Sequence, residues 1–169
     1  MSPVLGLDPG SRRTGYGVIE KRGGAPHFLA CGVIGPDVRA PLPERLGVIY
    51  REVRAVMRQW EPAEVAIESS FVHRNIRSAL VLGQARGAAL AAVMGETRQP
   101  RVVEYSPRQV KLSMTAFGGA EKAQVQKMVA LILRLGEPPA EDAADALAVA
   151  LCHLFRDRNP GMVAAGGGP

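Results

Sequence analysis

The first 34 residues contain three short apolar segments separated by short turns, and this pattern constrains the fold more than any other feature. The spacing predicts β-strands over residues 4–8, 16–21 and 27–34, with Gly- and Pro-containing turns between them. Turns this short allow only antiparallel pairing of consecutive strands. The beginning of the chain is therefore predicted to form an antiparallel meander.

The hydrophobic period changes after residue 41. Apolar residues from Leu42 to Trp60 recur at helical spacing between prolines, and residues 75–96 predict a second long helix. Strands are expected over residues 64–68 and 101–105, and each lies between two predicted helices. This alternation predicts an α/β fold with a mixed five-stranded sheet, in which parallel strands extend the meander and helices cover both faces. Three further helices are expected, over residues 107–117, 121–135 and 141–155.

Length and composition predict one domain with an ordinary apolar core. The chain has 169 residues, of which 47% are hydrophobic, and we expect residues 1–158 to form a single domain. Residues 159–169 are rich in Gly and Ala and predict a disordered tail. Cys31 and Cys152 lie in apolar segments without metal-binding spacing, which predicts reduced thiols in a cytoplasmic protein. Neither a signal peptide nor a bilayer-spanning segment is expected.

Acidic residues end two of the predicted buried strands. Asp8 follows Val4–Leu7 and precedes Pro9-Gly10, and Glu68 ends the strand over residues 64–68. Asp142 and Asp145, three positions apart, begin the last predicted helix and share one of its faces. Ligands gather at the carboxyl ends of parallel strands, so Asp8 and Glu68 meet there if the first and fourth strands are neighbours.

Taken singly, each acid has an ordinary structural explanation, such as a turn residue at Asp8 or a helix N-terminal charge at Asp142. Their joint occurrence beside apolar segments instead favours a site for a hard divalent cation. Two such ions, roughly 3.5–4 Å apart, can activate a water and stabilise a leaving oxygen in phosphodiester cleavage. The sequence does not distinguish Mg²⁺ from Mn²⁺.

Basic residues indicate a polyanionic partner. The net charge is +5, and Lys111 and Lys122 flank the Gly118–Gly119 break, from which both could reach one line of phosphates. The segment after Glu68 contains Phe71, a candidate for stacking on an unpaired base. The predicted DNA-contacting residues are Phe71, His73, Arg74, Arg77, Arg108, Lys111 and Lys122. A solvated helix face is the alternative explanation for such basic stretches.

Several segments together resemble the RuvC-type Holliday junction resolvases. They are GLDPGSRRTGYGVI at the start, AIESSF around Glu68, ALVLGQARG, RQVK around Lys111, AEKAQVQ around Lys122, and DAADALAVALCH near the end. The resemblance extends to about Phe155 and implies a ribonuclease-H-like fold, a homodimer and binding of four-way DNA junctions. By similarity, Asp8, Glu68, Asp142 and Asp145 match the family's catalytic, metal-binding acids.

The resemblance also implies roles for other residues and for partners. Lys111 and Lys122 match basic residues that support phosphate binding and cleavage, and Phe71 matches an aromatic residue that acts at the crossover. Two symmetric nicks with 5′-phosphate and 3′-hydroxyl ends are implied, with two Mg²⁺ or Mn²⁺ ions per site as the implied cofactors. The branch-migration proteins RuvA and RuvB are the implied partners.

Two other functions remain open from the residues alone. Asp8-Pro9-Gly10 also fits the first phosphate loop of actin-like ATP-using enzymes, although these enzymes close two such domains over a nucleotide. A non-enzymatic junction-binding protein is the second alternative, and loss of the catalytic acids would be its mark. All four acids are present in this chain.

Overall fold

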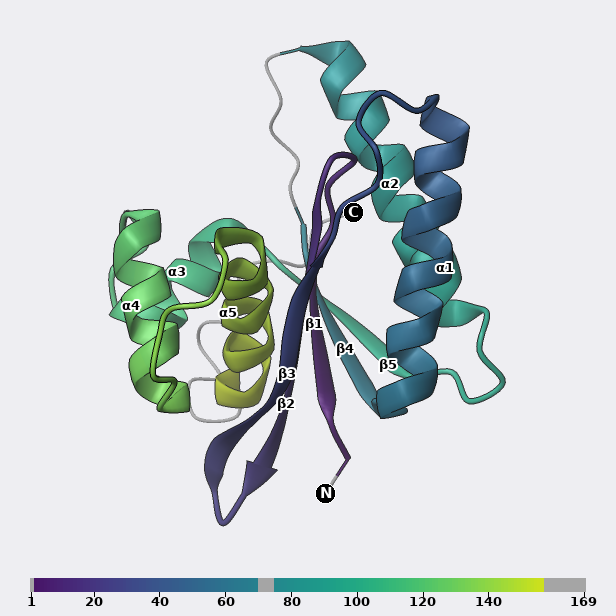
Figure 1. Ribbon diagram of the computed structural model, residues 1–169. Helices are drawn as coiled ribbons and strands as arrows, with labels where there is room; N and C mark the ends of the chain where they lie inside the picture. Colours follow the sequence, from purple (N-terminus) through teal and green to yellow (C-terminus); the bar gives the residue numbers. More distant parts are fainter. Residues whose placement is uncertain (1, 70–74, 157–169) are drawn as a thin grey trace.

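A mixed five-stranded sheet forms the centre of the computed structural model, which describes residues 2–69 and 75–156 (Figure 1). The strand order is β3-β2-β1-β4-β5. The first three strands form the predicted antiparallel meander, while β4 pairs parallel with β1 and β5 pairs parallel with β4. The strand bounds are β1 (Val4–Asp8), β2 (Thr14–Arg22), β3 (Ala25–Ile34), β4 (Glu64–Glu68) and β5 (Arg101–Tyr105).

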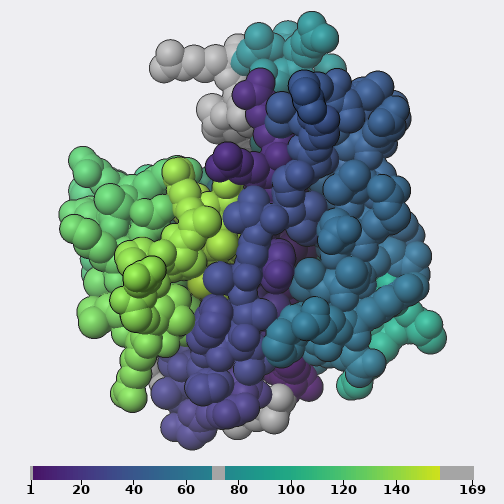
Figure 2. All heavy atoms as spheres, viewed as in Figure 1, coloured from purple at the N-terminus to yellow at the C-terminus, as the bar shows by residue number. Residues whose placement is uncertain are grey.

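Helices cover both faces of the sheet, as predicted. Figure 1 shows α1 and α2 on one side of the strands and α3, α4 and α5 on the other. The space-filling view in Figure 2 shows these helix groups as two masses, with the purple and dark blue strands between them. The helix bounds are α1 (Leu42–Trp60), α2 (Ile76–Met94), α3 (Pro107–Thr115), α4 (Lys122–Leu133) and α5 (Glu141–Phe155). None of the described helices is long and apolar enough to cross a membrane.

The alternation of side chains along β1 divides the interior into two cores. Leu5 and Leu7 are fully buried in the core shared with α1 and α2. Gly6 lies on the opposite face, against α5, which belongs to the other core. Cys152 is buried and Cys31 is half-buried, and both are free thiols whose pKa is raised by burial. Neither cysteine is therefore suited to act as a nucleophile.

The helix ends show where local chemistry determines the structure. Ser106 caps α3 through a reciprocal capping box with Gln109, and Pro107 occupies the first helical turn, as the sequence predicts. The C-terminus of α3 was predicted at Gly118–Gly119, which is wrong. The helix ends at Thr115 because Ala116 adopts the left-handed conformation.

Glycines on the sheet allow α5 to approach closely. A Cβ atom at Gly6 would overlap the backbone carbonyl of Ala146, and one at Gly15 would overlap the carbonyl of Asp142. Gly15 is also the antiparallel partner of Asp8. The missing side chain at Gly15 thus brings the first turn of α5 beside the end of β1.

Candidate active site

Asp8 and Glu68 lie at adjoining strand ends. The register pairs Val4 with Glu64 and Leu7 with Ile67, so the next residue on each strand is one of the two acids. Because β1 and β4 run parallel, both carboxylates emerge at the same edge of the sheet. The condition under which Asp8 and Glu68 were expected to meet, that the first and fourth strands are neighbours, is therefore fulfilled.

The last helix brings the other two acids to this edge. Asp142 and Asp145 lie in the first two turns of α5, above the Asp8–Gly15 pair. The Asp145 side chain is 16% exposed, and that of Asp142 is more open at 29%. Asp145 lines the groove described next, whereas Asp142 lies outside its lining.

A groove of about 370 Å³ runs over the carboxyl ends of β1 and β4. It receives side chains from two strands and from α2, α3, α4 and α5, so most layers of the fold contribute to it. Its lining residues are Asp8, Pro9, Glu68, Leu82, Pro107, Val110, Lys111, Lys122, Val125 and Asp145. The groove thus combines three carboxylates, two ammonium groups and an apolar floor.

Charge repulsion and burial act together on Asp8. Burial, followed by the negative charges of Glu68 and Asp145, raises the pKa of Asp8 from 3.8 to about 7. Asp142 adds a smaller effect in the same direction, and Lys122 opposes it. All four predicted acids are therefore close enough to interact electrostatically. Gathering such charges around a low-dielectric groove favours the uptake of either a proton or a cation.

Lys122 partly neutralises this negative charge. Its ammonium group donates hydrogen bonds to Glu141 at 2.9 Å and to Asp145 at 3.1 Å. These bonds, that to Glu141 first, raise the pKa of Lys122 above its ordinary range. The pKa of Asp145 is nevertheless raised, because burial outweighs the contribution of Lys122.

Two residues around the site, Glu141 and Arg13, were not among the predicted site residues. Glu141 accepts from Lys122, which lowers its pKa, and the Arg13 guanidinium lies 3.7 Å from Asp142. Glu141 precedes Asp142 directly and could have been found from that adjacency. Arg13 lies in the loop after β1, and its position depends on how that loop turns back toward α5, which no sequence pattern indicates.

The residues predicted to contact DNA are distributed differently. Lys111 lines the groove with Lys122, as expected from their places on either side of the glycine break. Arg108 is exposed on α3, with its side chain beside Gly118, and Arg77 is exposed in the first turn of α2. Phe71, His73 and Arg74 lie outside the described residues.

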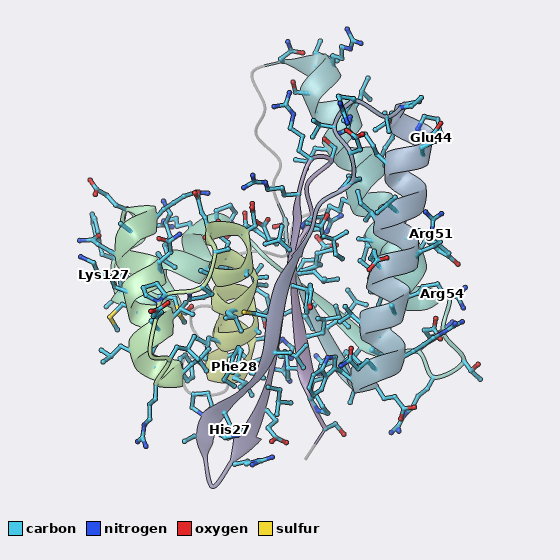
Figure 3. The ribbon with its side chains drawn as sticks, viewed as in Figure 1. His27, Phe28, Glu44, Arg51, Arg54 and Lys127 are labelled. Carbon is cyan, nitrogen blue, oxygen red and sulfur yellow. The ribbon has the colours of Figure 1, made fainter. Side chains whose placement is uncertain are left out.

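Basic side chains away from the groove lie on different sides of the part of the chain that the structure describes. Lys127 extends from α4 on one side of the molecule, whereas Arg51 and Arg54 extend from α1 on the other (Figure 3). Arg101 begins β5, at the opposite end of that strand from the groove. Only some of the Lys and Arg side chains can therefore face a ligand bound at the groove.

The carboxylate oxygens at the groove suit a hard cation, although they do not enclose one. Among residues 2–69 and 75–156, no group of three His, Cys, Asp or Glu side chains is arranged to hold a metal ion. Mg²⁺ retains several waters and needs only one or two carboxylates, together with substrate phosphate oxygens. The carboxylates of Asp8, Glu68 and Asp145 thus fit an open site that ligand and ion complete together.

The chain matches the family model described as crossover junction endodeoxyribonuclease RuvC over residues 4–153. It is 49% identical to the crossover junction endodeoxyribonuclease RuvC of Alkalilimnicola ehrlichii over 156 residues, which cover 92% of this chain and 93% of the relative. The Thermus thermophilus RuvC structure matches with a TM-score of 0.82 and 36% identity, over 92% of this chain and 95% of that one. A second structure, T. thermophilus RuvC in complex with Holliday junction substrate, matches with a TM-score of 0.82 at 35% identity, with the same coverage of both chains.

These matches confirm the ribonuclease-H-like fold and decide between the three functions considered from sequence. Proteins of the matched family are nucleases that hydrolyse DNA phosphodiester bonds, which replaces both the ATP-using and the non-enzymatic alternatives. The match extends over nearly all the described residues, including every acid at the groove. The chain belongs to the RuvC family of crossover junction endodeoxyribonucleases.

Proposed function

We propose that this protein resolves four-way DNA junctions by two symmetric nicks that leave 5′-phosphate and 3′-hydroxyl ends, in DNA recombination and repair. One observation carries the proposal: Asp8, Glu68 and Asp145 converge on a single groove, where burial and the two neighbouring charges raise the pKa of Asp8 to about 7. A relative of known structure is described in complex with a Holliday junction, which supports the same substrate here.

The four acids would hold divalent cations, with two Mg²⁺ or Mn²⁺ ions as the expected complement. When bound, such ions supply an activated water and stabilise charge on the phosphate. Asp8, whose pKa is raised by burial and by the charges of Glu68 and Asp145, would hold such an ion in its ionised form. Asp142, whose side chain is more exposed than that of Asp145, would act at the outer side of the site.

Lys122 and Lys111 would hold the scissile phosphate. Lys122 is bound to two carboxylates at 64% side-chain exposure, so a phosphate entering the groove can compete for its hydrogen bonds. Lys111 lines the same groove from α3. Arg77 and Arg108 are exposed and are proposed to contact the junction arms, as are Phe71, His73 and Arg74 in the segment after Glu68.

A homodimer would supply the second nick, and α2 offers a surface for it. Ile76, Leu80 and Met94 are exposed apolar residues on α2, at 81%, 64% and 41%. Gly83 and Gly87 continue this stripe at alternating steps of three and four residues, with open space above each. This is the spacing of a helix–helix seam, and a two-fold axis through it would give one site per cut strand.

RuvA and RuvB are the proposed partners, since branch migration delivers the junctions that this reaction consumes. We also place the protein in the cytoplasm, the compartment that holds the chromosome in bacteria.

The proposal is tested by incubating a synthetic four-way junction with protein and Mg²⁺ and mapping the cuts. Wild-type protein is expected to make paired symmetric nicks and to spare linear duplex. Asp8→Asn should bind the junction with similar affinity but leave it uncut, because phosphate binding depends mainly on Lys and Arg. Asp37→Asn, an exposed acid paired with Arg39 away from the groove, is the matched control and should cleave normally. Wild-type rates of nicking by Asp8→Asn would overturn the assignment.

A further inference from the structure

A polar cluster joins three elements at the far end of α5 from the acids. The Tyr105 hydroxyl lies 2.8 Å from Nδ1 of His153, and Nε2 of His153 lies 2.5 Å from Oε2 of Glu64. Tyr105 and His153 are each only 2% exposed. His153 follows Asp145 by eight residues, about 12 Å along the helix. The cluster is therefore separate from the groove.

The chemistry of the three groups assigns their protons. A carboxylate can only accept, so Nε2–H of His153 donates to Glu64, and Nδ1 of the neutral ring accepts from the Tyr105 hydroxyl. Burial lowers the pKa of His153 and raises that of Tyr105, in agreement with this assignment. Arg156 donates to the same Glu64 oxygen at 2.7 Å, and its Nη1 also lies 2.8 Å from Nδ1 and close to Nε2 of His153. The His153 ring thus has Tyr105, Glu64 and Arg156 as polar neighbours in a buried network.

The cluster connects two of the three elements that carry the acids. Glu64 begins β4, the strand that ends in Glu68, and His153 lies on α5, which carries Asp142 and Asp145. Tyr105 is the register partner of Glu68 on β5, and its carbonyl accepts from the Ser69 amide. A change at the cluster therefore alters the alignment of the elements on which the groove is built.

The remaining contact between α5 and the sheet is close and apolar. Ala146 and Ala150 face Gly6, the backbone of Asp142 faces Gly15, and the Leu147 side chain packs over Gly17. Apolar packing is non-directional, because it does not depend on which polar groups meet. Directional hydrogen bonds at one end therefore add specificity to the lengthwise position of the helix.

We propose that Tyr105, His153 and Glu64 form a positioning clamp that fixes α5 lengthwise against β4 and β5, and thereby sets the spacing of Asp142 and Asp145 from Glu68. The clamp touches neither substrate nor ion. Its effect on activity rests on the proposed function, because it acts through the acids proposed to hold the cations.

The test compares metal uptake with stability. Mn²⁺ binding to DNA-free protein is measured by electron paramagnetic resonance of the free ion, well below the melting temperature. His153→Leu should weaken Mn²⁺ binding about ten-fold, the scale on which supporting residues affect metal sites. It should lower kcat on the junction and leave the junction Kd unchanged. His153→Gln, whose amide can still donate to Glu64, should recover most of the affinity.

Val53→Ala is the matched control, since Val53 is buried in the core on the other face of the sheet. It should lower the melting temperature and leave Mn²⁺ affinity unchanged. Wild-type Mn²⁺ affinity in His153→Leu, or an equal loss in Val53→Ala, overturns the clamp.

If wild-type protein shows no saturable Mn²⁺ binding, the proposed metal site fails instead, and hydrogen exchange then decides the clamp. Amides of residues 141–148 should lose protection in His153→Leu relative to Val53→Ala. Equal protection in the two variants overturns the clamp.

Discussion

Asp8 is the residue at which folding and function oppose each other. The fold buries this carboxyl among other acids and raises its pKa to about 7, although an ordinary aspartate ionises near 3.8. Ionising Asp8 among these acids costs free energy in the protein without a bound cation. A bound cation would remove this cost, so the same arrangement favours cation binding. The position of Asp8 after a buried strand could be read from the sequence. The size of its pKa shift could not, because it depends on burial and on the charges of Glu68 and Asp145, which are distant in the sequence.

This raised pKa predicts a pH-dependent gain of stability for Asp8→Asn. Between about pH 4 and 7 the unfolded chain ionises Asp8 while the folded protein keeps it protonated. The contribution of Asp8 to wild-type stability therefore falls as pH rises and levels off above 7. Without metal, the advantage of Asp8→Asn over wild type should grow by roughly 2–4 kcal/mol across this range. Urea unfolding in EDTA at pH 4.5 and 7.5 measures it. A constant difference between the two proteins would contradict the electrostatic account.

Lys122 provides a second prediction at this scale. Lys122→Met removes the ammonium group that bridges Glu141 and Asp145 and is proposed to hold the phosphate. Cleavage should fall about 100-fold, the typical loss when one charge-stabilising donor is removed. Lys127→Met on the same helix is the control and should retain nearly full activity (Figure 3). Single-turnover cleavage of a junction measures both, and equal activity of the two variants would exclude this role.

At the scale of elements, the type of each helix and strand followed from its hydrophobic period, and the ends were less predictable. The strands, their antiparallel start and the capping of α3 by Ser106 were all confirmed. The end of α1 at Trp60 agrees with the prediction from the prolines, whereas the ends of α3 and α4 are set by left-handed residues at Ala116 and Arg134. Non-glycine residues in this conformation have no clear sequence signature, because tertiary packing imposes it.

The close contact between β2 and α5 gives a prediction at this scale. Gly15→Ala would drive a methyl group into the carbonyl of Asp142, so α5 must move away from Asp8. We expect a loss of about 2–3 kcal/mol in unfolding free energy, together with weaker cleavage. Gly35→Ala, with no neighbour within 4 Å, should change stability by less than about 0.5 kcal/mol. Urea unfolding of both variants provides the comparison, and equal stabilities would show that the contact is not limiting.

At the scale of the whole molecule, the two helix layers have separate tasks. The layer of α3, α4 and α5 supplies one acid and two lysines to the groove, while α2 reaches it through Leu82 and also presents an apolar stripe to solvent. The small residues of this stripe were visible in the sequence. Their exposure depends on which face of α2 packs on the sheet. From the periodicity alone, these small residues could have faced either the sheet or a second subunit.

Disruption of this stripe should separate the subunits. Leu80→Glu places a charge in the proposed seam of α2 and should shift the protein from dimer to monomer in sedimentation velocity. Leu131→Glu, on an exposed apolar residue of α4, is the control and should leave the mass unchanged. Monomeric wild-type protein would contradict the proposed homodimer. A dimer unaffected by Leu80→Glu would place its interface elsewhere.

The most direct test of the metal site is the anomalous scattering of Mn²⁺ in crystals grown with the ion and a junction. Strong peaks are predicted within coordination distance of Asp8 and Glu68, with Asp145 or Asp142 completing the set. Their loss in Asp8→Asn crystals would tie them to this carboxylate. An ordered groove without Mn²⁺, with the ion bound elsewhere on the protein, would contradict the assignment of these acids.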